Sequence, residues 1–191
     1  MKELQLPKAI PIRFYLNDEQ PKSRALDEDF SVEMAVIEKN GSEILSSAIM
    51  MEDRMVEAVS KILFGVSAKN GKNREFFVNE IMGTSDFSYA FKRRVFTRLL
   101  EQLEIIEPDE TKRLKTGLNK IMEWRNAFAH GQVLYEHNGG FVLQYFSGGH
   151  KEMILDDDFF ENVESTIRNC LYTCNGIIQS QKKHGVRSCN E

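Results

Sequence analysis

The chain has 191 residues, of which 41% are hydrophobic and 28% charged, and its net charge is −4. This composition is typical of a folded globular protein with a sizeable core and excludes an intrinsically disordered chain. The acidic balance argues against a protein that coats nucleic acid by bulk electrostatics, although it leaves room for a local basic site. No apolar run approaches the ~20 residues of a membrane span, and the N-terminus lacks the apolar region of a secretory signal. We therefore expect a cytoplasmic protein.

The N-terminal third divides into an arm and a long helix. Residues 1–30 contain three of the four prolines and show no sustained helical period, which predicts an extended arm. Helical spacing begins at Ser31, a residue type that suits an N-cap, and continues as a long amphipathic helix to Gly65. The pair Asn40-Gly41 either breaks or bends this helix.

Three further helices are expected before residue 131. A short one covers residues 74–82, and a longer one follows over residues 87–106. The polar face of the longer helix carries four basic residues: Lys92, Arg93, Arg94 and Arg98. A run of this kind is more often a solvated face than a phosphate-binding stripe, and both interpretations stay open. Pro108 suits the first turn of the third helix.

After Gly131 the hydrophobic period changes to two. Two alternating runs joined by an Asn-Gly-Gly sequence predict a hairpin, a third strand is expected at 151–155, and a final helix follows. We predict a mainly α fold, a bundle of four to five helices with a small β-hairpin or meander before the C-terminal helix. The predicted division is an arm (1–30), one helical domain (31–184) that contains the hairpin (about 132–155), and a polar tail (185–191).

The three cysteines come late in the chain, and their odd number makes a poor disulfide framework. With His184 they form C-x3-C-x9-H-x4-C, which offers four soft ligands. Zinc sites usually begin on a tight knuckle, however, whereas Cys170 and Cys174 lie one helical turn apart. We favour reduced thiols packed against a core, and we expect neither a metal nor another cofactor.

The segment IMEWRNAFAHGQ, residues 121–132, places Arg125, Asn126 and His130 on an otherwise apolar helical stretch. At ~100° per residue, Asn126 and His130 share a face of a continuous helix, whereas Arg125 and His130 diverge by about 140°. Two arrangements would let them meet one ligand. Either the helix ends one residue before His130, with Gly131 as a left-handed C-cap, or a second copy of the chain supplies the missing partner across a two-fold axis.

These residue types suit phosphoryl transfer without a metal. An arginine side chain is a permanent forked cation that matches phosphate oxygens. A histidine can take a proton from a ribose 2′-hydroxyl and return one to a leaving oxygen near neutral pH. In RNA the internal 2′-hydroxyl is already placed as the nucleophile. In a purely structural alternative, Arg125 pairs with a nearby glutamate and His130 stabilises the C-terminal end of its helix.

The run R-N-x-F-A-H near the end of a late helix resembles the signature of the HEPN superfamily. Over about residues 40–135, the order of ILSSAIMMEDRMVEAVSKIL, LEQLEII and KIMEWRNAFAHG is similar in particular to the mannitol operon repressor (MltR-like) branch. The resemblance implies a helical bundle that commonly dimerises. Many members are metal-independent endoribonucleases of toxin–antitoxin, phage-defence and RNA-processing systems, whereas the mannitol repressor branch is regarded as regulatory.

The resemblance also implies roles for single residues. Arg125 and His130 match the catalytic pair of the nucleases, and Asn126 matches the polar residue that assists them. One toxin subgroup has a tyrosine two positions after the histidine. This chain has Gln132 there, so the self-modifying antitoxin arrangement of that subgroup is not implied.

Two functions follow as expectations. The first is a homodimeric, metal-independent endoribonuclease with Arg125, Asn126 and His130 in a shared cleft. The residues expected to guide its RNA are basic: Lys92, Arg93, Arg94 and Lys120. The second is a non-catalytic HEPN-like module that binds a regulatory protein partner or controls an operon, whereas an antitoxin is a possible partner of the first. Direct DNA binding is the weaker form of the second, since no helix-turn-helix with a basic recognition helix is present.

Overall fold

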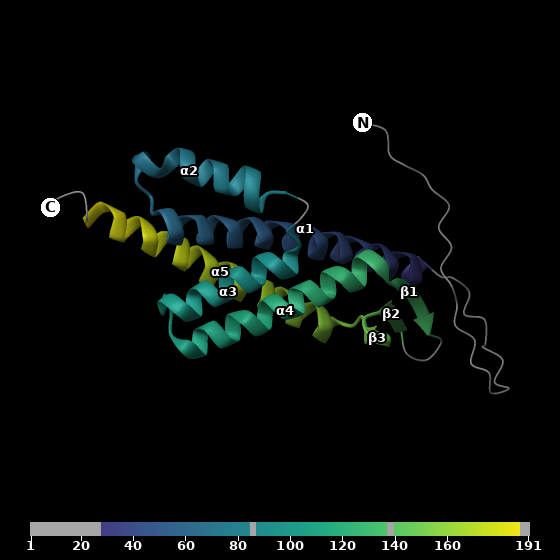
Figure 1. Cartoon of the computed structure of the whole chain (residues 1–191). Coiled ribbons are helices and arrows are strands. Elements are labelled where there is room, and N and C mark those ends of the chain that lie inside the picture. The colour runs from purple at the N-terminus through teal and green to yellow at the C-terminus, as the bar shows by residue number, and fades with distance from the viewer. Residues whose placement is uncertain (1–27, 85–86, 137–139, 188–191) are drawn as a thin grey trace. The chain divides into compact units, whose positions relative to one another are not determined.

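The computed structural model describes residues 28–84, 87–136 and 140–187, so the expected arm lies almost wholly outside the described residues. Within them the chain is mainly helical, with five α-helices and a small antiparallel sheet before the last helix (Figure 1), which confirms the predicted fold class. The elements are α1 (Glu28–Phe64), the 3₁₀ turn η1 (Ala68–Asn70), α2 (Gly71–Phe76), the π-helix η2 (Phe77–Met82), α3 (Tyr89–Leu103), α4 (Pro108–His130), β1 (Gln132–Glu136), β2 (Gly140–Phe146), β3 (His150–Ile154) and α5 (Asp157–Arg187).

The chain divides into two compact units, and α1, α4 and α5 contribute to both. The first unit contains the start of α1, the last turns of α4, the sheet and the start of α5. The second contains the rest of α1, α2, η2, α3, most of α4 and the remainder of α5. None of the described helices carries an apolar stretch that would reach across a bilayer.

In the first unit, α1 begins at Glu28, three residues before the predicted N-cap, and it is not broken at Asn40-Gly41. Glycine occupies position 41 because another helix packs closely against it. A Cβ atom on Gly41 would lie 2.8 Å from Cδ1 of Phe128 on α4, so glycine is needed here for the approach of a ring. A glycine inside a helix lowers its intrinsic stability, and the packing against Phe128 explains its presence.

The three strands form an antiparallel sheet in the order β1-β2-β3, with Leu134 opposite Val142 and Val142 opposite Ile154. This confirms the predicted meander. Alternate residues of β2 point to one face and build the core of the unit, because side chains alternate along a strand. The buried members of that core are Ile37, Ala127, Tyr135, Phe141, Leu143, Tyr145 and Leu155. After the sheet, Asp156 caps α5 by accepting a hydrogen bond from the backbone N–H of Phe159 at 2.8 Å.

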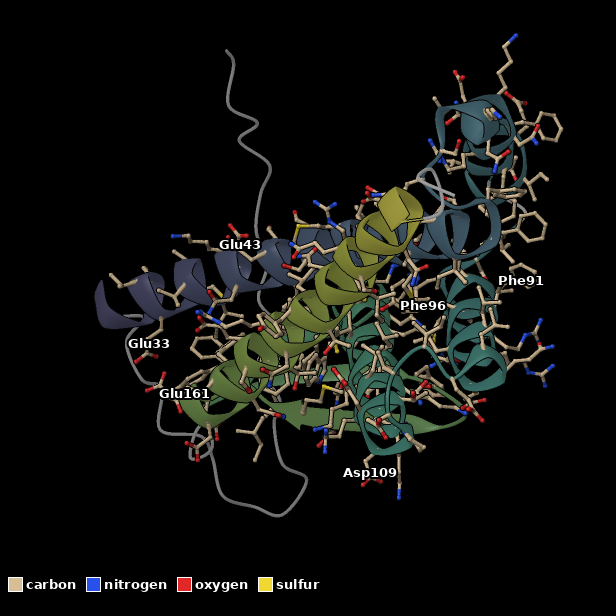
Figure 2. All side chains as sticks on the ribbon, turned by 90° about the vertical axis from the view of Figure 1, so that its left-hand side faces the viewer. Glu33, Glu43, Phe91, Phe96, Asp109 and Glu161 are labelled. Carbon is tan, nitrogen blue, oxygen red and sulfur yellow. The ribbon has the colours of Figure 1, made fainter. Side chains whose placement is uncertain are left out.

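The second unit has a core of long apolar side chains. Its fully buried members include Met51, Met55, Phe96, Leu100, Leu118 and Ile121. Figure 2 shows Phe91 and Phe96 directed to different sides of α3, and Phe96 is the one that the core encloses. The helical spacing of these residues in the sequence therefore marks the buried sides of α1, α3 and α4.

Cys170 and Cys174 belong to the same core, as the sequence predicts. Both thiols are free and buried, and Sγ of Cys174 lies 4.0 Å from Sδ of Met51. Burial raises the pKa of Cys170 to about 11 and the pKa of Cys174 to about 12. The third cysteine of the rejected zinc pattern, Cys189, lies outside the described residues.

Gly117 lets α4 and α5 approach closely in this unit. A Cβ atom at this position would lie 2.5 Å from Sγ of Cys170, whereas a Cβ atom on Gly176 of α5 would meet nothing within 4 Å. We expect Gly117→Ala to lower the free energy of unfolding by about 1–3 kcal/mol through overpacking. Gly176→Ala, the matched helical control, should raise it by up to ~1 kcal/mol.

Urea unfolding monitored by circular dichroism measures both changes. Adding Cys170→Ala to Gly117→Ala should recover part of the loss, because the colliding sulfur is then absent. Equal effects of the two glycine substitutions would contradict the packing described here.

The raised thiol pKa values predict a loss of stability at alkaline pH. Above pH ~9 the unfolded thiols ionise while the folded ones keep their protons, so unfolding releases protons and becomes more favourable. The contribution of each protonated thiol to the free energy of unfolding is fully present at pH 8. It should decline by up to ~1.4 kcal/mol per pH unit between pH 9 and the pKa of that thiol in the folded protein. Urea titrations at pH 8, 9 and 10 check this, and Cys174→Ala should flatten the decline.

Candidate functional site

The C-terminal end of α4 has a buried side and an exposed side. Trp124 and Ala127 are buried, at 5% and 0% exposure, whereas Arg125, Asn126 and His130 are all exposed. The helical period produces this separation, because the apolar residues that pack inward leave the intervening positions outward. All three predicted site residues therefore lie on the solvent side of one helix.

The helix does not end before His130. It includes His130, and the N–H of Gly131 still donates a hydrogen bond to the carbonyl of Ala127 at 2.7 Å, as in a continuing helix. The first of the two arrangements, which has a left-handed cap at Gly131, is not found, because the described glycines with positive φ are at other positions: 65, 140, 148 and 149. Glycine is needed at 131 for another reason. A Cβ atom there would lie 2.4 Å from the carbonyl oxygen of Ala127 and 2.6 Å from that of Gln144.

The unbroken helix fixes which site residues share a direction. Asn126 and His130 are four residues apart and differ by about 40°, so the structure brings this pair to one side of α4. Arg125 and His130 differ by about 140° around the same helix, so one α4 does not aim both at one small ligand. Two exposed residues lie between these directions around the helix: Ala129, which has a short side chain, and Asn126.

Lys92 corrects the predicted polar face of α3. Its side chain is only 7% exposed, and Nζ lies 2.5 Å from Oε1 of Glu52 on α1, whose side chain is 29% exposed. Position 92 turns inward because its helical neighbours Tyr89 and Phe96, three before and four after, are both buried. A lysine enclosed in an ion pair is not available to guide RNA, so Lys92 does not belong with the RNA-guiding residues expected from the sequence.

The other three basic residues differ in exposure. Arg93 is half-buried, and its Nη1 is enclosed without a hydrogen-bond partner. Arg94 is exposed, with its guanidinium carbon 5.4 Å from the ring centroid of Phe91. Lys120 of α4 is exposed as well. Only Arg94 and Lys120 thus have the full solvent access that contact with a nucleic acid backbone requires.

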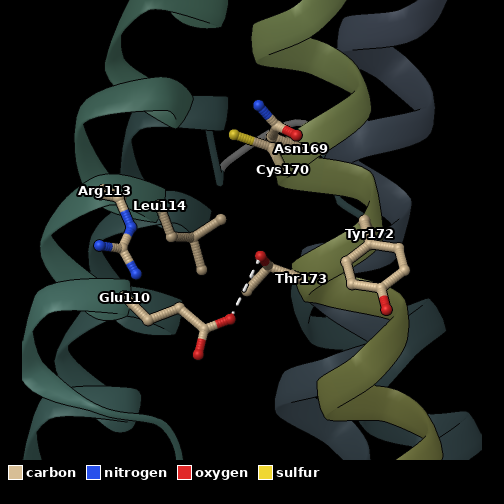
Figure 3. Close-up of a pocket in the computed structure, with 7 residues that line it drawn as sticks. All are labelled: Glu110, Arg113, Leu114, Asn169, Cys170, Tyr172 and Thr173. Atoms are coloured by element: carbon tan, nitrogen blue, oxygen red, sulfur yellow. Dashed lines mark hydrogen bonds between the residues drawn. The ribbon is translucent and has the colours of Figure 1, made fainter.

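A shallow pocket opens between α4 and α5 within the second unit (Figure 3). Its volume is about 370 Å³, and Oγ1 of Thr173 donates a hydrogen bond of 3.5 Å to Glu110 at its edge. Arg113 and Cys170 also line it. Burial raises the Cys170 pKa to about 11, so this thiol is neutral at physiological pH and is a poor nucleophile. None of the predicted site residues lines the pocket.

Comparisons of the chain with protein-family models, with curated proteins and with solved structures find no match. Among the described residues, no group of three or more His, Cys, Asp or Glu side chains is arranged to hold a metal ion.

The burial of Lys92 predicts a stability effect that its exposed neighbour lacks. Lys92→Ala removes the partner of Glu52 from a mostly buried pair and should lower the free energy of unfolding by roughly 2 kcal/mol. Arg94→Ala on the same helix should change it by less than ~0.5 kcal/mol. Thermal and urea unfolding of the two variants measure the difference, and equal stabilities would contradict a structural role for Lys92.

Proposed function

We propose that the protein is a HEPN-like, metal-independent endoribonuclease that acts as a homodimer. The observation that carries this proposal is the joint exposure of Arg125, Asn126 and His130 on the last turns of α4, opposite a buried apolar side. A guanidinium, a carboxamide and an imidazole on consecutive turns of one exposed surface are groups that suit cleavage of a phosphodiester. The R-N-x-F-A-H resemblance supports the same assignment.

The proposed reaction uses the 2′-hydroxyl of RNA as its own nucleophile. His130 takes the proton of that hydroxyl, the 2′-oxygen attacks the adjacent phosphorus, and the bond to the 5′-oxygen of the next nucleotide breaks. A protonated imidazole returns a proton to the leaving oxygen. Arg125 stabilises the negative charge that develops on the phosphoryl oxygens, and Asn126 orients the imidazole beside it. The products carry a 2′,3′-cyclic phosphate and a 5′-hydroxyl.

The angle between Arg125 and His130 explains why two copies are proposed. On one unbroken α4 the two side chains point about 140° apart, so a single chain cannot direct both the base and the cation at the same phosphodiester. A two-fold axis beside the end of α4 would bring identical helices face to face and place Arg125 of one copy near His130 of the other. A toxin of a toxin–antitoxin or phage-defence system is the setting that the resemblance implies.

The first test is RNA cleavage in EDTA by the wild type and by His130→Ala. The variant should cleave at least 10²-fold more slowly, because general acid–base catalysis contributes 10²–10⁴-fold. His150→Ala is the matched control, since His150 is also exposed and lies in β3, outside the proposed site. Cleavage products are resolved on a denaturing gel, their ends are identified chemically, and thermal melts confirm folding. Equal RNA turnover by the wild type and His130→Ala would overturn the proposal.

A mixing experiment tests the shared site. Arg125→Ala and His130→Ala are inactive alone, but a randomly mixed dimer contains one intact site if each site uses one residue from each copy. Half of the dimers are then mixed, so about a quarter of the wild-type activity should return. Recovery of no activity would place both residues in one chain and reject the two-fold arrangement.

One observation favours the alternative, a non-catalytic HEPN-like regulatory or protein-interaction module. His130 is the last residue of α4, where a cationic imidazole is stabilised by the helix dipole. In this case, Arg125→Ala and His130→Ala would each lower the free energy of unfolding by up to ~1 kcal/mol. RNA would stay intact with the wild type.

A further inference from the structure

The segment that follows α1 is held in place by its own polar side chains. Asn70 donates from Nδ2 to the carbonyl of Phe64 at 2.6 Å, and Nη1 of Arg74 donates to the carbonyl of Gly65 at 2.6 Å. The hydroxyl of Ser67 accepts from the N–H of Lys69 at 3.3 Å. α2 and the π-helix η2 that continues it form a run of twelve residues, a length that is marginal by itself, so these bonds fix η1 and α2 to the end of α1.

The opposite side of the same segment faces solvent. Lys69, Lys72, Asn73 and Phe76 follow the spacing i, i+3, i+4 and i+7, which places them within about 100° of one another on a helical surface, and all four are exposed. Phe76 is 60% exposed. The two lysines have no ion-pair partner among the described residues. We call these four residues the α2 face.

The sequence that leads into the α2 face is basic although the chain as a whole is acidic. Between Glu57 and Glu75 the sequence contains four basic residues and no acidic one: Lys61, Lys69, Lys72 and Arg74. Lys61 pairs with Glu57 at 2.5 Å, and Arg74 holds the loop, so the lysines at 69 and 72 are the two that reach outward. Two exposed acidic residues follow the lysines: Glu75 projects about 100° away from Phe76, and Glu80 of η2 lies four residues beyond Phe76.

We propose that the α2 face is a docking surface for single-stranded RNA, in which Phe76 stacks on a base while Lys69 and Lys72 contact the flanking phosphates. Aromatic side chains beside cations are the usual means by which proteins hold unpaired nucleotides, because every base presents a flat π surface and every linkage a charge. Asn73 supplies a carboxamide that donates and accepts hydrogen bonds at a base edge. The inward bonds of Asn70 and Arg74 preorganise the face, which lowers the entropy lost on binding.

The composition of the α2 face favours RNA over a membrane surface. A helix that lies in a bilayer interface needs a broad apolar side, whereas Phe76 is the one apolar member of this face and a carboxamide lies beside it. The inference deepens the proposed function and rests on it for the choice of RNA, because the proposed chemistry requires a 2′-hydroxyl. The α2 face itself takes no part in that chemistry.

The test measures RNA binding by the full chain carrying His130→Ala, so that the probe survives. Fluorescein-labelled oligo(U) and oligo(A) are titrated by anisotropy at several salt concentrations. Lys69→Glu/Lys72→Glu should weaken binding at least tenfold and reduce the slope of log K against log salt by about 1.4, at ~0.7 per lost phosphate contact. Phe76→Ala should weaken binding roughly tenfold by loss of stacking.

The matched control is Lys39→Glu/Lys112→Glu, which makes the same change in net charge at two exposed positions of α1 and α4. It should weaken binding less than about twofold at 150 mM salt, where screening limits distant charges. Equal weakening by the control and the α2-face variants, or no RNA binding at all, would overturn the proposal. So would variants that lose binding to phosphatidylserine vesicles while keeping RNA affinity.

The two proposals fail separately. If the wild type cleaves RNA and the α2-face variants bind it normally, the docking surface is wrong and the nuclease stands. If the α2 face binds RNA and His130→Ala does not affect cleavage, the docking surface stands and the proposed nuclease site is wrong.

Discussion

The junction between α4 and β1 sets the geometry of the candidate site. At Gly131, two carbonyl oxygens, those of Ala127 and Gln144, approach so closely that a Cβ atom would lie 2.4 and 2.6 Å from them. The helix can therefore keep its hydrogen bonding through His130 and still pass directly into the sheet at Gln132. Because the backbone is regular here, the directions of Arg125, Asn126 and His130 follow from helical geometry alone. Any function assigned to the motif must be compatible with the angle of about 140° between Arg125 and His130.

Periodic features of the fold could be read from the sequence, whereas features that depend on one distant atom could not. The buried sides of α1, α3 and α4 and the meander follow from spacings of three to four or of two residues, which burial imposes directly. Asn40-Gly41 looks like a helix break, but the ring of Phe128, 87 positions later, needs the space that the glycine leaves. Gly131 likewise looks like a left-handed cap in the sequence. A local pattern cannot show that the carbonyl oxygen of Gln144 will lie against this glycine.

Lys92 illustrates the limit for charged residues. In the sequence it begins a run of four basic residues that resembles a solvated stripe, but of these Arg94 and Arg98 are the exposed members. Its burial depends on Glu52, which lies 40 residues earlier and supplies the compensating carboxylate at 2.5 Å. The exposure of Arg125, Asn126 and His130, in contrast, could be expected, because their polar types alternate with the buried Trp124 and Ala127 within one turn. The sequence thus proposed the candidate residues and two ways of combining them, and the unbroken α4 excludes the one that needs the helix to end before His130.

The second unit buries a lysine and exposes a phenylalanine, and the two exceptions have different explanations. Lys92 is enclosed because Glu52 neutralises it and the packed residues Tyr89 and Phe96 flank it on α3. Nothing inside the described structure explains the exposure of Phe76, since α2 is anchored by Asn70 and Arg74 from its other side. Phe76 lies one helical turn beyond Lys72 and is 60% exposed, so most of its apolar surface stays in water and contributes little to folding. We propose that this ring contacts a ligand with a flat apolar surface and negative charge, the combination that a single strand of RNA presents.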